Sequence, residues 1–181
     1  MKKLFILGIC LLLTSCFEIT EKIKHNSNQS GDYSLVIDFS NSWLKTKSAI
    51  LLEEVDGVSI PNEEDIKSKL AQFRADASKI KGTSKISTSY DFNTYVFKIN
   101  FSYNSIETLN AVLNTIDKKN SLVHFKNNNG RFERIASYPL PKDLAKKEDK
   151  KEDLLKANIT AVYTFDKDVA TVQNPNSKLS K

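Results

Sequence analysis

The chain has 181 residues, 27 basic and 22 acidic, and a formal net charge of +5. This length suits one compact domain or two very small ones. Lys2 and Lys3 belong to the leader described next, and without these two the excess is 25 − 22 = +3, which is too small to indicate a nucleic-acid partner.

The first residues have the pattern of an export signal. Lys2 and Lys3 precede a run from Leu4 to Leu13 that is apolar apart from Gly8. Ten helical residues rise only about 15 Å, roughly half the hydrocarbon thickness of a bilayer, so this run is too short to be a permanent span. We therefore expect residues 1–15 to be a signal peptide that is removed.

The leader ends in Leu13-Thr14-Ser15-Cys16, which resembles the bacterial lipobox. The resemblance implies that the Cys16 thiol is joined to diacylglycerol, that cleavage occurs just before Cys16, and that the new amine is often acylated as well. Two or three fatty chains make release from a membrane slow, at about 0.8 kcal/mol per buried methylene. The competing interpretation is a core cysteine or a disulfide with Cys10, but Cys10 lies inside the apolar run and is removed with it.

If Cys16 carries lipid, the mature chain keeps no thiol for a nucleophile, a disulfide or a metal site. Phe17 follows the cysteine, where enterobacterial inner-membrane lipoproteins carry an Asp. The resemblance therefore implies a lipid-anchored protein of the cell envelope, and of the outer membrane if the source has two membranes.

The mature chain begins with a predicted β-hairpin and no spacer. Residues 26–31, Asn-Ser-Asn-Gln-Ser-Gly, have the composition of a turn between two alternating segments. One face of each segment carries the following residues: Phe17, Ile19, Glu21 and Ile23, then Tyr33, Leu35, Ile37 and Phe39.

Two helices are predicted next. The first spans Ser40 to Val55 and stops at Asp56-Gly57, with these residues available for the core: Trp43, Leu44, Ile50, Leu51 and Val55. The second begins at Asn62, an N-cap followed by acidic residues in the first turn, and ends near Gly82. Its apolar stripe consists of Ile66, Leu70, Phe73, Ala77 and Ile80.

The second half repeats this alternation of hairpins and helices. Residues 86–92 and 95–103 predict a second hairpin with a turn at 91–94, and its second strand alternates without a break: Tyr95, Phe97, Ile99, Phe101 and Tyr103. Ser105 caps a helix that runs to Ile116. A third hairpin (122–126 and 131–137), a charged helix (142–157), a strand (159–165) and a further short strand around 169–172 complete the expectation.

Strands with one apolar and one polar face belong in antiparallel sheets, and the amphipathic helices can cover the apolar face. We predict an α+β fold of antiparallel hairpins covered on one face by helices, as a two-layer sandwich, with two adjacent subdomains as the variant. The lipid-anchored domain spans residues 16–165, and 166–181 form a short strand and a frayed tail.

One family resemblance rests on the first hairpin. The lipobox cysteine, the extended segment without a spacer, the turn "NSNQSGDYS" and the alternating return strand are similar to LppM-like bacterial lipoproteins. The likeness covers roughly residues 13–40. It implies an envelope protein without known catalytic residues.

Residues for catalysis or metal binding are sparse. The two histidines, His25 and His124, have no second histidine at helical spacing, and we expect both to be partly exposed strand residues. Glu63-Glu64-Asp65 are explained by the helix start, and Glu53-Glu54 lie at a helix end. Such pairs act in glycosidases only when held about 5 to 9 Å apart across a cleft. No catalytic, cofactor-binding or metal-binding residue is therefore predicted, and the protein is not expected to be an enzyme.

Three hypotheses follow. The favoured one is a non-catalytic, membrane-anchored lipoprotein that binds or assembles with a membrane-associated protein close to the bilayer surface. The alternative is a small-ligand or lipid-binding lipoprotein, with an enclosed apolar pocket between sheet and helices or with the Tyr95–Tyr103 stripe as a ligand platform rather than a core face. The third, an enzyme, needs clustered titratable groups in a cleft.

Overall fold

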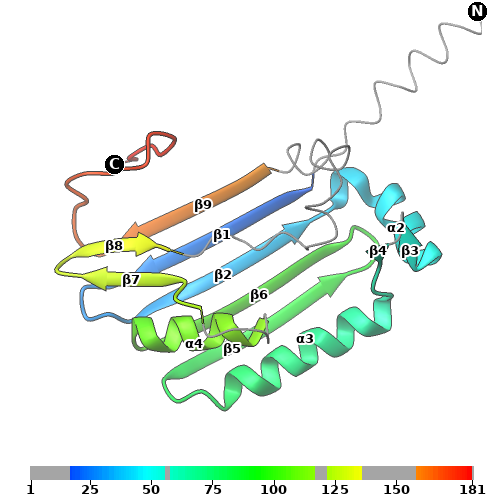
Figure 1. The fold of residues 1–181 in the computed structure, drawn as a ribbon, viewed down its shortest axis with the longest axis horizontal. Coiled ribbons are helices and arrows are strands. Elements are labelled where there is room, and N and C mark those ends of the chain that lie inside the picture. The colour runs from blue at the N-terminus through cyan, green and yellow to red at the C-terminus, as the bar shows by residue number, and fades with distance from the viewer. Residues whose placement is uncertain (1–16, 56–57, 117–121, 136–157, 181) are drawn as a thin grey trace, which may run out of the picture.

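The computed structural model describes residues 17–55, 58–116, 122–135 and 158–180. A five-stranded sheet in the order β5-β6-β2-β1-β9 is its centre (Figure 1). The sheet strands are β1 (Glu18–His25), β2 (Gly31–Asp38), β5 (Thr83–Asp91), β6 (Val96–Tyr103) and β9 (Asn158–Phe165). The helices are α2 (Trp43–Leu52), α3 (Glu63–Ser78) and α4 (Ile106–Ile116), and the 3-10 turn η2 (Ser40–Ser42) precedes α2. The predicted α+β class is confirmed.

The sheet is mixed, although only antiparallel pairing was expected. β1 pairs antiparallel with β2, β2 with β6, and β6 with β5, but β9 pairs parallel with β1, with Ile159 opposite Ile19. A parallel neighbour needs a crossover connection. Here the chain between β1 and β9 includes the other strands and the helices. The predicted charged helix (142–157) lies outside the described residues.

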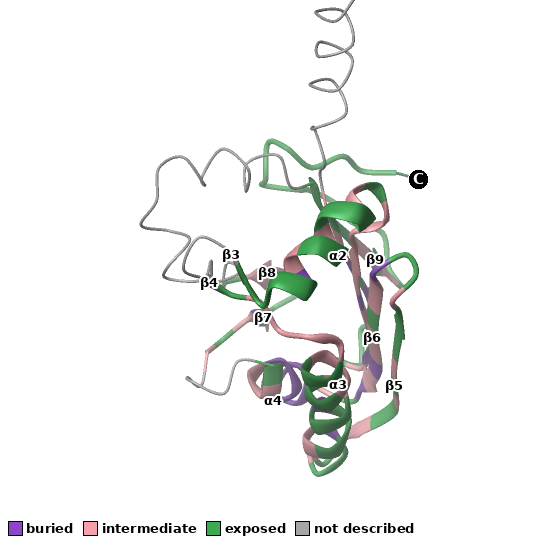
Figure 2. Cartoon of the chain, turned by 90° about the vertical axis from the view of Figure 1, so that its right-hand side faces the viewer, coloured by how far each residue is buried: buried purple, intermediate pink, exposed green. Residues whose placement is uncertain are grey.

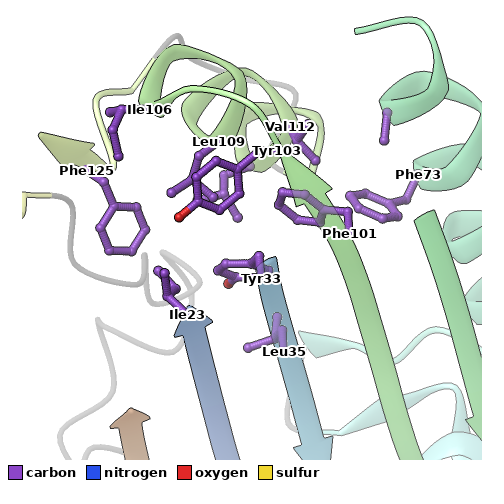
Figure 3. Close-up of a cluster of buried hydrophobic side chains, with 12 residues drawn as sticks. Ile23, Tyr33, Leu35, Phe73, Phe101, Tyr103, Ile106, Leu109, Val112 and Phe125 are labelled. Atoms are coloured by element: carbon purple, nitrogen blue, oxygen red, sulfur yellow. The ribbon is translucent and has the colours of Figure 1, made fainter. Parts of the chain in front are cut away.

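The two faces of the sheet differ in chemistry. Ile23, Tyr33 and Phe101 lie side by side on three neighbouring strands, and each is at most 3% exposed. Helix α4 covers them with Leu109 and Val112, while α3 packs on β5 and α4. Figure 2 shows α3 and α4 on one side of the sheet, and Figure 3 shows the buried side chains converging between the layers.

The Tyr95–Tyr103 stripe is therefore a core face, as the favoured interpretation predicted, and not an open ligand platform. Its burial is uneven along the strand. Phe101 and Tyr103 are 1% and 2% exposed, whereas Phe97 and Ile99 are only partly buried.

Helix α2 differs most from its prediction. It ends at Leu52 rather than Val55, because Glu53 adopts a left-handed conformation (φ 55°) and a two-residue strand, β3 (Glu54–Val55), follows and pairs with β4 (Val58–Ser59). Of the expected core residues in the helix only Ile50 is buried. The prediction was wrong for Trp43, Leu44 and Leu51, because α2 packs chiefly on η2 and β3 and not on the large sheet.

The starts of α3 and α4 are as predicted. The Asn62 side chain accepts a hydrogen bond from the Asp65 backbone N–H, and the Asp65 carboxylate accepts one from the Asn62 backbone N–H, which forms a capping box. The Ser105 hydroxyl accepts from the Thr108 N–H at 3.2 Å. Gly82 has φ +95° after α3, and a Cβ there would lie 2.1 Å from the side-chain oxygen of Asn104. This position needs glycine for both reasons.

The third hairpin forms, but separately from the large sheet. It consists of β7 (Phe125–Asn128) and β8 (Arg131–Arg134). Its fully buried Phe125 stacks on Phe132 at 5.4 Å and also contacts Tyr163 of β9. The segment 166–180 contains no strand, so the short strand expected around 169–172 is absent.

Truncation of Phe101 tests the position of the core. The ring lies 4.9 Å from the Tyr33 ring and 6.4 Å from the Phe73 ring. Phe101→Ala should lower the free energy of unfolding by about 3 to 5 kcal/mol, because it removes packed atoms and leaves a cavity. Phe97→Ala, the same change on the same strand at a partly exposed ring, should cost clearly less. Chemical denaturation measures both, and equal losses would contradict the uneven burial.

Candidate functional site

The described fold begins directly after the predicted lipidation site. Cys16 itself lies outside the described residues, and Phe17 is the first described residue. The Phe17 ring stacks on Phe39 at 5.3 Å, and its carbonyl accepts a hydrogen bond from the Asn158 N–H at 3.1 Å. The next residue, Glu18, is paired with Asp38 in the sheet. There is consequently no slack between Phe17 and the sheet.

We call the end of the sheet where β1 and β9 begin and β2 ends the anchor end. A chain of aromatic rings crosses it from β1 to β5. Neighbouring ring centroids lie 4.9 to 6.3 Å apart along the series Phe17, Phe39, Phe97, Phe92 and Tyr90. Tyr90 is 45% exposed, and the other four rings are partly buried. The anchor end is thus aromatic but incompletely covered.

Further along β1, the carboxylate of Glu21 is completely buried on the inner face of the sheet. Its Oε1 accepts from Arg134 Nε at 3.2 Å and from the Tyr163 hydroxyl at 2.9 Å. Its Oε2 accepts from the second guanidinium nitrogen of Arg134 at 3.2 Å and from the Tyr33 hydroxyl at 3.1 Å. A buried carboxylate is costly unless it is paired and hydrogen-bonded, and this one is both.

The Glu21 cluster joins separate parts of the chain. Arg134 comes from β8, Tyr163 from β9 and Tyr33 from β2, while the guanidinium also lies over the Phe125 ring at 5.4 Å. The ion pair therefore attaches the β7–β8 hairpin to the large sheet.

His25 makes a second polar attachment at the far end of β1. It is 3% exposed, so the expectation of a partly exposed His25 was wrong. Its Nε2 lies 2.8 Å from the Asn127 amide nitrogen, and its Nδ1 lies 3.0 Å from the Tyr103 hydroxyl. Because an amide nitrogen only donates, Nε2 accepts and Nδ1 carries the proton. Burial lowers the pKa of His25, and the Asp166 carboxylate opposes this only partly.

The strand residue His25 is buried because the β7–β8 hairpin covers it, with the tilted Phe132 ring 4.8 Å from its own ring. His124, just before β7, is partly buried as expected, and its Nε2 lies 3.2 Å from the Asn114 side-chain oxygen. Burial also raises the pKa of Tyr103, whose hydroxyl contacts His25.

The other sequence candidates do not come together. Glu53 ends α2, Glu54 is exposed, and Glu63, Glu64 and Asp65 form the first turn of α3. No group of three or more His, Cys, Asp or Glu side chains in the described ranges could hold a metal ion. An open hollow on the outer face of the sheet is lined largely by polar residues, among them Lys22, Asp32, Lys85 and Asn100.

The chemical capacity of these groups is limited. The Glu21 carboxylate faces Arg134 and two tyrosines, and both ring nitrogens of His25 have partners. Sequence reasoning missed both clusters, although Glu21 was placed on the apolar face of its strand. That placement was the available signal, because an acidic residue on a buried face requires a partner.

No family model matches the chain, and no curated protein or solved structure matches it. Within the described part, no helix is both long and apolar enough to cross a membrane.

Removal of the Arg134 charge tests the Glu21 cluster. Arg134→Met should lower the free energy of unfolding by about 3 to 5 kcal/mol, because it leaves the Glu21 carboxylate buried without its cation. Arg131→Met on the same strand is the matched control, since that side chain is 63% exposed and should cost about 0 to 1 kcal/mol.

A double-mutant cycle with Glu21→Gln isolates the pair. The double variant Glu21→Gln/Arg134→Met should be more stable than the sum of the two single losses predicts, because no unpaired charge remains. Strict additivity in urea denaturation would show that the two side chains are not coupled.

Proposed function

We propose that this protein is a lipid-anchored lipoprotein of the cell envelope that binds a membrane-associated partner, without catalysing a reaction. The lipobox-like Leu13-Thr14-Ser15-Cys16 supports the anchor. The observation that carries the binding role is the direct entry of the chain into the sheet at Phe17, because it removes the freedom of an ordinary Ser/Gly tether.

The paired state of β1 limits the reach of the domain. Eight extended residues span about 26 Å, but Glu18–His25 are hydrogen-bonded between β2 and β9 and cannot peel away without breaking both ladders. A domain held in this way stays next to the lipid headgroups in a restricted orientation. Such a domain suits partners that lie in or against the same membrane.

The interior favours contact binding over an enclosed ligand. The described space between the sheet and α4 is filled by large side chains, among them Phe101, Tyr103 and Leu109 (Figure 3). The two titratable clusters are engaged in holding the β7–β8 hairpin, which supports a non-catalytic role.

Replacement of Cys16 tests the anchor. Cys16→Ser should abolish lipid attachment and shift the protein from detergent-requiring membrane fractions to an unprocessed or soluble form, because the lipidated thiol is gone. Intact mass and fractionation report the result. An unchanged mass and an unchanged distribution would refute lipidation at Cys16.

A spacer tests whether closeness to the membrane matters. Fifteen Gly/Ser residues inserted after Cys16 give a root-mean-square reach of about 20 Å. The variant should fold and be lipidated, but it should capture fewer cross-linked membrane partners. The same segment inserted after Ser177, in the exposed tail, is the control and should leave capture unchanged. Equal capture by both variants at equal abundance would show that the short connection has no functional role.

A further inference from the structure

Helix α2 exposes four large apolar side chains, which we call the α2 apolar face. Trp43 is 47% exposed, Leu44 62%, Leu51 74% and Leu52 68%. Leu44 and Leu51 are seven residues apart and therefore lie on the same side of the helix, two turns from each other. Trp43 and the buried Ile50 are also seven residues apart, so Trp43 lies about 100° around the helix from Leu44, at the border between the exposed leucines and the buried side.

The α2 apolar face lies at the anchor end. Phe39, whose ring stacks on Phe17, is followed at once by η2, and its carbonyl accepts from the Ser42 N–H at 2.8 Å. Helix α2 starts directly after η2, and Figure 1 shows it beside the end of the sheet where β1 begins. Ile159, 53% exposed and paired with Ile19, adds an apolar side chain to the same end.

We propose that the α2 apolar face inserts into the interfacial layer of the bilayer that holds lipidated Cys16, as a second membrane contact. This inference rests on the proposed lipid anchor. Tryptophan is favoured at the boundary between headgroups and acyl chains, and leucines gain free energy by leaving water there. Lys47 is exposed one turn from Trp43 and can extend its amine to the headgroups.

The bilayer is the favoured occupant because of where the chain enters the sheet. Cys16 directly precedes Phe17, and the Phe17 ring contacts Phe39, the residue that precedes η2. The anchored lipid and α2 therefore share one edge of the domain. A protein covering α2 would have to fit between this edge and the membrane.

Trp43 is the single tryptophan of the sequence, so the tryptophan fluorescence of the protein reports the environment of α2. The full-length lipidated protein is reconstituted into phosphatidylcholine/phosphatidylglycerol vesicles with brominated or unbrominated acyl chains. Trp43 emission should be at least twofold lower in brominated vesicles, because bromine quenches only by contact. As control, Trp43→Phe/Asn128→Trp moves the reporter to the exposed last residue of β7, where quenching should be absent.

A second variant separates insertion from incidental contact. Leu44→Ser/Leu51→Ser keeps Trp43 and changes two exposed positions, and it should reduce the quenching at least twofold. Intact mass establishes lipidation in every sample. A protein without lipid on Cys16 overturns the anchor. In the lipidated protein, Trp43 quenching no greater than that of the control reporter overturns α2 insertion alone. A blue-shifted but unquenched Trp43 also overturns it, because protein then covers the face.

Discussion

The backbone pairing of β1 is the constraint on which the rest of the molecule depends. This strand is hydrogen-bonded to β2 on one side and to β9 on the other, so residues at the two ends of the chain are held in one sheet. Its inner face supplies Ile23 to the core, Glu21 to the ion pair with Arg134 and His25 to the contact with Asn127. Because the strand starts at Glu18, the same ladder sets the position of Phe17 and of any anchor attached before it.

The two ends of the sheet have different physical roles. At the end remote from Phe17, the β7–β8 hairpin closes the inner face through Phe125 and Phe132 and through polar contacts with Glu21 and His25. At the anchor end, the rings are partly buried and α2 leaves leucines in solvent. The domain is therefore polar in its distribution of apolar surface: one end is covered by the β7–β8 hairpin, and the other exposes apolar side chains. The proposed lipid attachment lies at the end with the exposed apolar side chains.

The buried polar groups fit a structural role in this arrangement. Bidentate pairing to Arg134 and two tyrosine hydroxyls offset the desolvation of Glu21, but such a pair contributes little net stability compared with apolar packing. It does restrict the geometry, because Arg134 can reach the carboxylate only when the β7–β8 hairpin lies against the inner face of the sheet at Glu21. The hairpin has just four residues in each strand, and two-stranded hairpins of that kind are marginal alone.

The sequence by itself determined the elements that depend on local chemistry. The alternation around Tyr33 and Phe101 predicted the two hairpins and their buried faces, and Asn62 with Asp65 predicted the start of α3, because side-chain period and capping act over a few residues. Only the tertiary structure decided which elements meet. The parallel partner of β1, the burial of His25 and the pairing of Glu21 with Arg134 join positions about a hundred or more residues apart, and no local pattern records them. The exposed face of α2 was decided in the same way, since Leu44 and Leu51 look like core residues until the helix is placed beyond the edge of the sheet that could have covered them.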